Sequence, residues 1–355
     1  MPCVPCMKLT GWMPINMSDT YSNAELQALW QRGRDFLGCE YAILGGAMSW
    51  LSERNLVSAI SNAGGFGVIA CGSMMPDMLA DEIAATKEMT DKPFGVNLIT
   101  MHPELDALID VCIDGSVSHV VLAGGLPSGA SIAKIKDAGR KVICFAPAAA
   151  LAKRLIRNGA DALVIEGSEA GGHIGPVSTS VLAQEILPNV TDVPVFVAGG
   201  IGRGEAMVSY LEMGAAGCQL GTRFVCATES IAHPDFKKAF IRANARDAMP
   251  TVQLDEKFPV IPVRALVNEG TKRFMQKQRE AADRVEAGEV ELKDAQLDIE
   301  HFWAGALKQA VIDGDVENGS LMAGQSVGMV KSEQSIQEII DELVAQAGHA
   351  LTARK

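Results

Sequence analysis

The feature that most constrains the fold is an alternation of short apolar segments with longer amphipathic ones between residues 41 and 220. The apolar segments have the length and the β-branched content of buried strands, and helical patterns separate most of them. Strands that alternate with helices form a parallel sheet that those helices cover. The predicted strands span residues 41–44, 66–71, 94–99, 119–123, 141–145, 162–166, 195–198 and 217–220.

Eight such strands, spaced roughly 20 to 30 residues apart, favour a sheet closed into a (β/α)8 TIM barrel. A doubly wound open sheet is the alternative, but the chain lacks an early Gly-x-Gly-x-x-Gly fingerprint. Three parts are therefore predicted. They are an N-terminal extension and helix (1–38), the barrel (39–229 and 331–355), and a smaller, mostly helical insertion or lid (230–330) before the closing helix.

The balance of charges limits the partners of this chain. It carries a net charge of −12, and a surface this acidic argues against nucleic acid or an anionic membrane. Because no apolar run could span a bilayer and the first residues lack a secretory signal, we expect a cytoplasmic protein. Cys3 and Cys6 have the spacing of half a zinc site, but no second pair of ligands follows, so no metal is predicted.

The sixth predicted strand runs directly into a glycine-rich loop, Glu166-Gly-Ser-Glu-Ala-Gly-Gly-His-Ile-Gly175. Parallel α/β proteins place their chemistry at the carboxyl ends of their strands. Glycines such as Gly171 and Gly172 let the backbone approach a ligand that a Cβ would exclude. His173, the one histidine in such a loop, is therefore a candidate acid or base. A histidine that merely packs in a glycine turn is the plainer alternative.

Two more glycine-rich segments follow the seventh and eighth predicted strands, where this fold binds phosphate. Their candidate residues are Ala198, Gly199, Gly200, Gln219, Gly221 and Thr222. Free backbone N–H groups near a helix N-terminus bind anions, and Thr222 can add a hydroxyl donor; two ordinary glycine turns are the alternative. A phosphate cradle with a lone histidine is typical of an FMN barrel, in which the flavin supplies the redox chemistry.

Two further candidates stand at predicted strand ends. Asn97 ends the third strand, where its amide either faces the barrel mouth or caps the next helix. Met48 follows the small residues that end the first strand. A methionine in that position more often fills core space than contacts a cofactor.

Together these motifs resemble the nitronate monooxygenase (2-nitropropane dioxygenase) family and its relatives, the FMN-dependent enoyl-acyl-carrier-protein reductases. The likeness covers residues 40–345. Besides the histidine loop, it rests on Ala63-Gly-Gly-Phe-Gly67, Pro93-Phe-Gly-Val-Asn97, Val197-Ala-Gly-Gly-Ile201, Gln219-Leu-Gly-Thr-Arg-Phe224 and Gly319-Ser-Leu-Met-Ala-Gly-Gln325. The chain departs from the pattern at Ala42 and Gly45, where the family has a proline and a flavin-contacting glutamine.

The resemblance implies FMN as the cofactor and His173 as the catalytic residue. The residues it places at the flavin are Met48, Asn97, Glu166, Gly171, Gly172, Ala198, Gly199, Gly200, Gln219, Gly221, Thr222, Met322, Gly324 and Gln325. The favoured activity is oxidation of alkyl nitronates or nitroalkanes with O2 to a carbonyl compound and nitrite. The alternatives are NAD(P)H-dependent reduction of an enoyl thioester and a flavin- or phosphate-binding barrel without turnover. The implied partner is a small-molecule substrate, and whether the chain forms a homodimer is left open.

Overall fold

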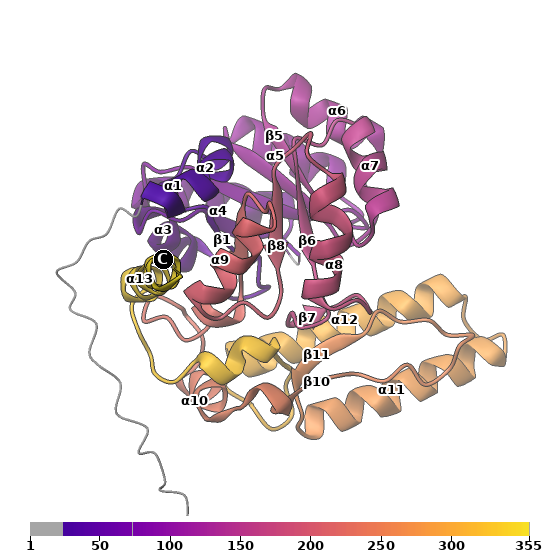
Figure 1. Cartoon of the computed structure of the whole chain (residues 1–355). Coiled ribbons are helices and arrows are strands. Elements are labelled where there is room, and N and C mark those ends of the chain that lie inside the picture. The colour runs from indigo at the N-terminus through magenta and orange to yellow at the C-terminus, as the bar shows by residue number, and fades with distance from the viewer. Residues whose placement is uncertain (1–23, 73, 355) are drawn as a thin grey trace, which may run out of the picture.

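The computed structural model describes residues 24–72 and 74–354. Within them, eight parallel strands form one sheet in the order β1-β9-β8-β6-β5-β4-β3-β2. A parallel bridge between Leu44 and Phe66 joins its two edges. The sheet is thus the predicted (β/α)8 barrel (Figure 1). Its strands are β1 (Ile43–Gly45), β2 (Gly67–Ala70), β3 (Phe94–Ile99), β4 (His119–Ala123), β5 (Lys141–Phe145), β6 (Ala162–Glu166), β8 (Val195–Ala198) and β9 (Gly217–Leu220).

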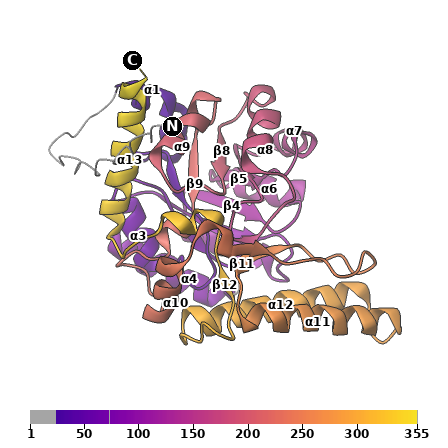
Figure 2. The ribbon, with the colours of Figure 1, turned by 60° about the horizontal axis from the view of Figure 1, so that its bottom comes forward.

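Helices surround the barrel and bury their apolar sides against it (Figures 1 and 2). Local capping explains where several of them begin. The Glu53 carboxylate accepts the first free N–H groups of α3, and Ser335 and Glu338 form a capping box at α13. These helices are α3 (Arg54–Asn62), α4 (Pro76–Met89), α5 (Leu105–Asp114), α6 (Gly129–Asp137), α7 (Ala149–Arg157), α8 (Thr179–Ile186), α9 (Gly204–Glu212) and α13 (Ile336–Ala353).

The predicted N-terminal helix is divided in two. The backbone turns at Trp30, a fully buried residue, so that α1 (Ala24–Leu29) is followed by α2 (Gln31–Leu37). Residues 1–23, including Cys3 and Cys6, lie outside the described residues.

His119 ties α2 to the amino-terminal end of the barrel. Its ring packs edge-on against Phe36 and Phe66, with centroids 5.0 and 4.8 Å away. The two ring nitrogens lie 2.9 Å from Ser118 Oγ and 3.0 Å from the Phe36 carbonyl oxygen. Burial lowers the pKa of His119 to about 4, so the imidazole is neutral and structural at physiological pH.

Residues 230–330, the predicted insertion, are called the lid segment below. It contains α10 (Pro234–Arg242), α11 (Glu269–Glu286) and α12 (Leu292–Val311). The last two pack side by side, with the rings of Phe274 and Trp303 4.1 Å apart, and they extend as an arm beside the barrel (Figures 1 and 2). Among the described residues, no helix is both long and apolar enough to cross a membrane.

The lid segment also contributes a small sheet that the sequence did not predict. Strand β11 (Val263–Leu266) pairs antiparallel with β10 (Ala248–Pro250), with β12 (Leu321–Met322), and with β7 (Gly172–His173) of the loop after β6. Because β7 belongs to the loop at the carboxyl end of a barrel strand, this pairing fastens the lid segment to the face of the barrel that carries chemistry.

Candidate functional site

The loop after β6 packs so closely against α8 that position 167 has no room for a side chain. A Cβ on Gly167 would lie 2.2 Å from the Thr179 nitrogen. The Glu169 carboxylate accepts hydrogen bonds from the Thr179 N–H at 2.7 Å and from its hydroxyl at 2.8 Å. Glu169 therefore caps α8 and fixes the loop. Sequence reasoning missed this role, because a cap that acts across ten residues leaves no local pattern.

Residues 322–325 of the lid segment meet this loop directly. A Cβ on Gly171 would lie 2.5 Å from the Gly324 nitrogen, so the two backbones touch. The Gln325 N–H donates to the Glu169 carbonyl at 2.9 Å, and the Gly324 N–H donates to Thr222 Oγ1 at 2.9 Å. Three segments predicted to contact one cofactor are thus brought together. Beside them, Met322 Sδ would lie 3.6 Å from a Cβ on Gly172.

The two glycine loops after β8 and β9 form a half-buried cluster of N–H donors. Gly199 and Gly200 have φ values of +95° and +73°, which L side chains rarely adopt. In the described part of the chain, the N–H groups of Gly199, Gly200, Gly221 and Thr222 have no hydrogen-bond acceptor. Sheltered N–H groups without an acceptor are rare in folded proteins. The cluster is therefore suited to an anion, as predicted for a phosphate cradle.

The helix that follows contributes less than the sequence suggested. The first N–H of α9, from Gly204, donates to Gln346 Oε1 of α13 at 2.9 Å. The buried Arg223 guanidinium is engaged as well, because it pairs with Glu342 at 2.7 Å. An anion in the cradle would thus be held by the glycine-loop N–H groups and the Thr222 hydroxyl.

Predicted side chains also line up across neighbouring strands. Glu166, Ala198 and Gln219 are in register on β6, β8 and β9. Asn97, on β3, lies four strands from β8 in either direction and so on the opposite wall of the barrel. Asn97 does not cap α5, whose N-cap is Glu104. Asn97 is instead a buried polar residue of the barrel wall.

Met48 lies beside the second glycine loop. Its Sδ would be 3.5 Å from a Cβ placed on Gly221, and its N–H donates to Ser52 Oγ at 2.9 Å. Met48 is half-buried, so it borders the cradle as well as packing against the core.

A cavity of about 330 Å³ opens at the carboxyl ends of β4, β5 and β6. Its walls are mostly apolar, and Glu166 is the one charged side chain in them. The other lining residues are Gly124, Gly125, Leu126, Phe145, Ala146, Pro147, Leu151 and Gly175. Burial raises the pKa of Glu166 to about 8. Burial is the only cause of this shift, with no hydrogen bond or nearby charge contributing to it, so near pH 7 the carboxyl group is mostly neutral and can donate a proton to a hydrogen bond.

His173 is held by the lid segment rather than by the barrel. It belongs to β7, whose residues pair with Val263 and Arg264 of β11. The Arg264 guanidinium donates from Nε to the Ser168 carbonyl at 2.8 Å and so locks the same junction. The His173 Nε2 lies 3.0 Å from Glu300 Oε2 of α12. Neither Arg264 nor Glu300 could be found from the sequence, because only the tertiary fold brings them to the loop.

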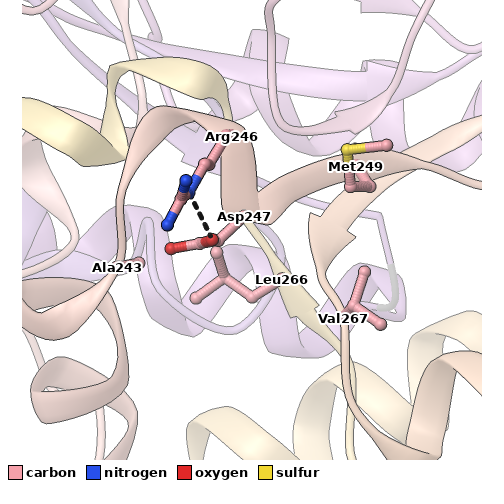
Figure 3. Close-up of a pocket in the computed structure, with 6 residues that line it drawn as sticks. All are labelled: Ala243, Arg246, Asp247, Met249, Leu266 and Val267. Carbon is pink, nitrogen blue, oxygen red and sulfur yellow. Dashed lines mark ion pairs between the residues drawn. The ribbon is translucent and has the colours of Figure 1, made fainter.

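A second hollow lies on the lid segment, away from these residues (Figure 3). It is lined by Ala243, Arg246, Asp247, Met249, Leu266 and Val267. Arg246 and Asp247 face each other at 3.9 Å and neutralise one another. None of the predicted site residues lines this hollow, so the chemistry is to be sought at the barrel mouth.

A (β/α)8 barrel with its polar side chains gathered at the carboxyl ends of the strands has the organisation of an enzyme. A family model described as "Nitronate monooxygenase" matches residues 31–108 and 104–346. The chain therefore belongs to the nitronate monooxygenase family of oxidoreductases, in agreement with the resemblance seen in the sequence.

Comparison with individual proteins gives relatives of more than one kind. The chain is 31% identical to "(3aS,4S,5R,7aS)-5-hydroxy-7a-methyl-1-oxo-octahydro-1H-indene-4-carboxyl-CoA dehydrogenase" of Mycobacterium tuberculosis, over 88% of this chain and 94% of the relative. Among solved structures, FabK from Thermotoga maritima is similar with a TM-score of 0.81 and 35% identity, over 91% and 97% of the two chains. A nitroalkane oxidase from Streptomyces ansochromogenes follows with a TM-score of 0.75 and 27% identity, over 91% and 99%.

Proposed function

We propose that this protein is an FMN-dependent oxidoreductase that oxidises alkyl nitronates, or nitroalkanes, with O2 to a carbonyl compound and nitrite. The observation that carries the proposal is the meeting of three segments at one barrel mouth. The His173 loop, the glycine cradle after β8 and β9, and residues 322–325 are joined by the hydrogen bonds of Gly324 and Gln325. Membership of the nitronate monooxygenase family supports it.

The cradle suits the phosphate of FMN. Four N–H groups without acceptors come from two adjacent loops, and the Thr222 hydroxyl can donate to an anion while its oxygen accepts from Gly324. The residues that would hold the cofactor are those predicted from the sequence, from Met48 after β1 to Gln325 after β12. When bound, FMN supplies the acceptor and donor of electrons that the side chains of this chain cannot provide.

The protein's own residues would handle the proton and the substrate. His173 can take a proton from the carbon next to a nitro group, or hold the nitronate once that proton is gone. Glu166, neutral near pH 7, can donate a hydrogen bond to an uncharged ligand oxygen in the apolar cavity. Asn97 can donate and accept from the opposite wall. The apolar residues around Glu166 would exclude water from that side.

A second candidate is redox chemistry on a thioester. It is favoured by the relatives, because the dehydrogenase of Mycobacterium tuberculosis acts, by its name, on a CoA compound. A nitro group and a thioester carbonyl both acidify the neighbouring carbon, so His173 could serve either substrate in the same way. In the reductase direction, NAD(P)H would supply the electrons.

Anaerobic reduction of the bound flavin tests the proposal. The purified protein is mixed with propionate 3-nitronate, with NADH or with NADPH, and bleaching of the flavin absorbance is followed. Rapid bleaching by the nitronate, and slow or no bleaching by the nucleotides, is expected. If NADH or NADPH reduces the flavin, the nitronate does not, and an enoyl thioester then reoxidises the flavin, the protein is a thioester reductase and not a nitronate oxidase. A flavin reduced by none of them would contradict both the nitronate activity and the reductase direction of the second candidate.

A further inference from the structure

The lid segment holds His173 at two independent points. Its backbone is paired with Val263 on β11, and its imidazole Nε2 lies 3.0 Å from the Glu300 carboxylate on α12. The two contacting residues, Val263 on β11 and Glu300 on α12, are far apart in the sequence, and both belong to the lid segment. The side chain that meets the imidazole thus comes from the lid segment and not from the barrel.

We propose that Glu300 is a positioning residue for His173, which fixes the orientation and the tautomer of its ring. The proposal rests on the proposed role of His173 in proton transfer. A carboxylate 3.0 Å from Nε2 favours a proton on that nitrogen. In the neutral ring the other nitrogen, Nδ1, is then the acceptor. Nδ1 has no partner among the described residues, so it is free to take a proton from a substrate.

The contacts of the neighbouring charged residues support this pairing. Arg264, next to His173 in the small sheet, is turned to the carbonyls of Ser168 and Ala248, so it does not compete for Glu300. The nearest acidic side chain of the loop, Glu169, is committed to Thr179. Glu300 is thus the one carboxylate placed against the imidazole in the described structure.

The size of the effect follows from exposure. The His173 and Glu300 side chains are 41% and 34% exposed, and pairs with such access to water are worth little in stability. Removing Glu300 should therefore leave the fold intact. It should lower kcat by less than the roughly 10²-fold or more that loss of the base itself would cost, because the ring loses its orientation and not its proton-accepting nitrogen. KM should stay nearly constant, because Glu300 has no assigned contact with the substrate.

The experiment compares three variants of the full-length protein as purified. Glu300→Ala removes both the acceptor and the charge. Glu300→Gln keeps an oxygen that can accept from Nε2–H but removes the charge. Asp294→Asn, an exposed change on the same helix α12, is the matched control. Each protein is labelled with ¹⁵N-histidine, and the His173 signals are assigned by their loss in His173→Ala. The ¹⁵N shifts then report which ring nitrogen carries the proton.

The proposal predicts an Nε2–H tautomer in the wild type, in Asp294→Asn and in Glu300→Gln, and a mixture of tautomers in Glu300→Ala. It also predicts that kcat falls only in Glu300→Ala. An unchanged tautomer in Glu300→Ala would overturn it, and so would equal losses in the Ala and Gln variants. If the Ala variant is not recovered folded, Glu300→Asp can replace it in the test. Its shorter side chain places the carboxylate about one bond length farther from His173 Nε2, so it should give the same mixture of tautomers. Because the tautomer is read without turnover, a protein inactive on nitronates would refute the proposed function and leave this test standing.

Discussion

Replacing Glu166 by glutamine should stabilise the flavin-free protein at high pH and leave it nearly unchanged at low pH. In the unfolded chain a glutamate ionises near its ordinary value of 4.5, whereas burial raises the pKa of folded Glu166 to about 8. Below pH 4.5 the group is neutral in both states. As the pH rises toward 8, the unfolded state loses its proton first, so the folded state loses relative stability. Glutamine has the same shape and no such penalty.

The magnitude follows from the interval between the two pKa values. Each pH unit in the interval from 4.5 to about 8 corresponds to about 1.4 kcal/mol, so the full penalty at pH 9 is at most about 5 kcal/mol. Glu166 borders the open cavity, where water screens part of the charge, so we expect about 2 to 3 kcal/mol.

The assay is chemical unfolding of wild type and Glu166→Gln at pH 5, 7 and 9, after removal of any flavin. Glu88→Gln, on the exposed side of α4, is the control for loss of one charge. The difference in unfolding free energy should grow steadily with pH for Glu166→Gln alone. A difference that does not change with pH, or a variant less stable than wild type at pH 9, would refute the reasoning.

Three further outcomes are expected. Gly221→Asp should lose FMN, whereas Gly221→Asn should retain it. A Cβ at this position meets nothing closer than Met48 Sδ at 3.5 Å, so only the charge of the aspartate should repel the phosphate. Equal flavin content in the two variants would show that the phosphate does not bind at this loop. His173→Ala should keep FMN and lose about 10²- to 10⁴-fold in rate on neutral nitroalkanes, but much less on preformed nitronates; equal losses would assign His173 to binding. The free energy of unfolding of the wild type should fall by up to about 3 kcal/mol as the pH falls from 6.5 to about 4. The cause is that His119 binds a proton in the unfolded chain but stays neutral when it is buried in the folded protein. The same dependence of stability on pH in His119→Asn would contradict this.

The barrel could be predicted from the sequence because its signals are local. A buried parallel strand is a short apolar run between turn formers, and β3, β4, β5, β6, β8 and β9 begin and end where that pattern placed them. Capping is local as well, since Glu53 accepts the first free N–H groups of α3 two and three residues after it. The glycine motifs likewise indicated which loops would approach one another.

The architecture around His173 could not be predicted in the same way. Strands β7 and β12 have two residues each, too few for any alternation to be visible. The pairing of β7 with β11 and the contact of Glu300 with His173 depend on how the lid segment folds back onto the barrel. Glu300 lies in a charged helix where nothing distinguishes it from its neighbours. Its place became clear only from three-dimensional proximity.

The cofactor content of the purified protein tests the central claim most directly. The protein is purified without added flavin, its visible spectrum is recorded, and the small molecule released on denaturation is identified and quantified. We expect a yellow protein that releases close to one FMN per chain. A protein that is colourless and stays so after incubation with FMN would contradict the account, and release of FAD would show that the cradle after β8 and β9 has been misread.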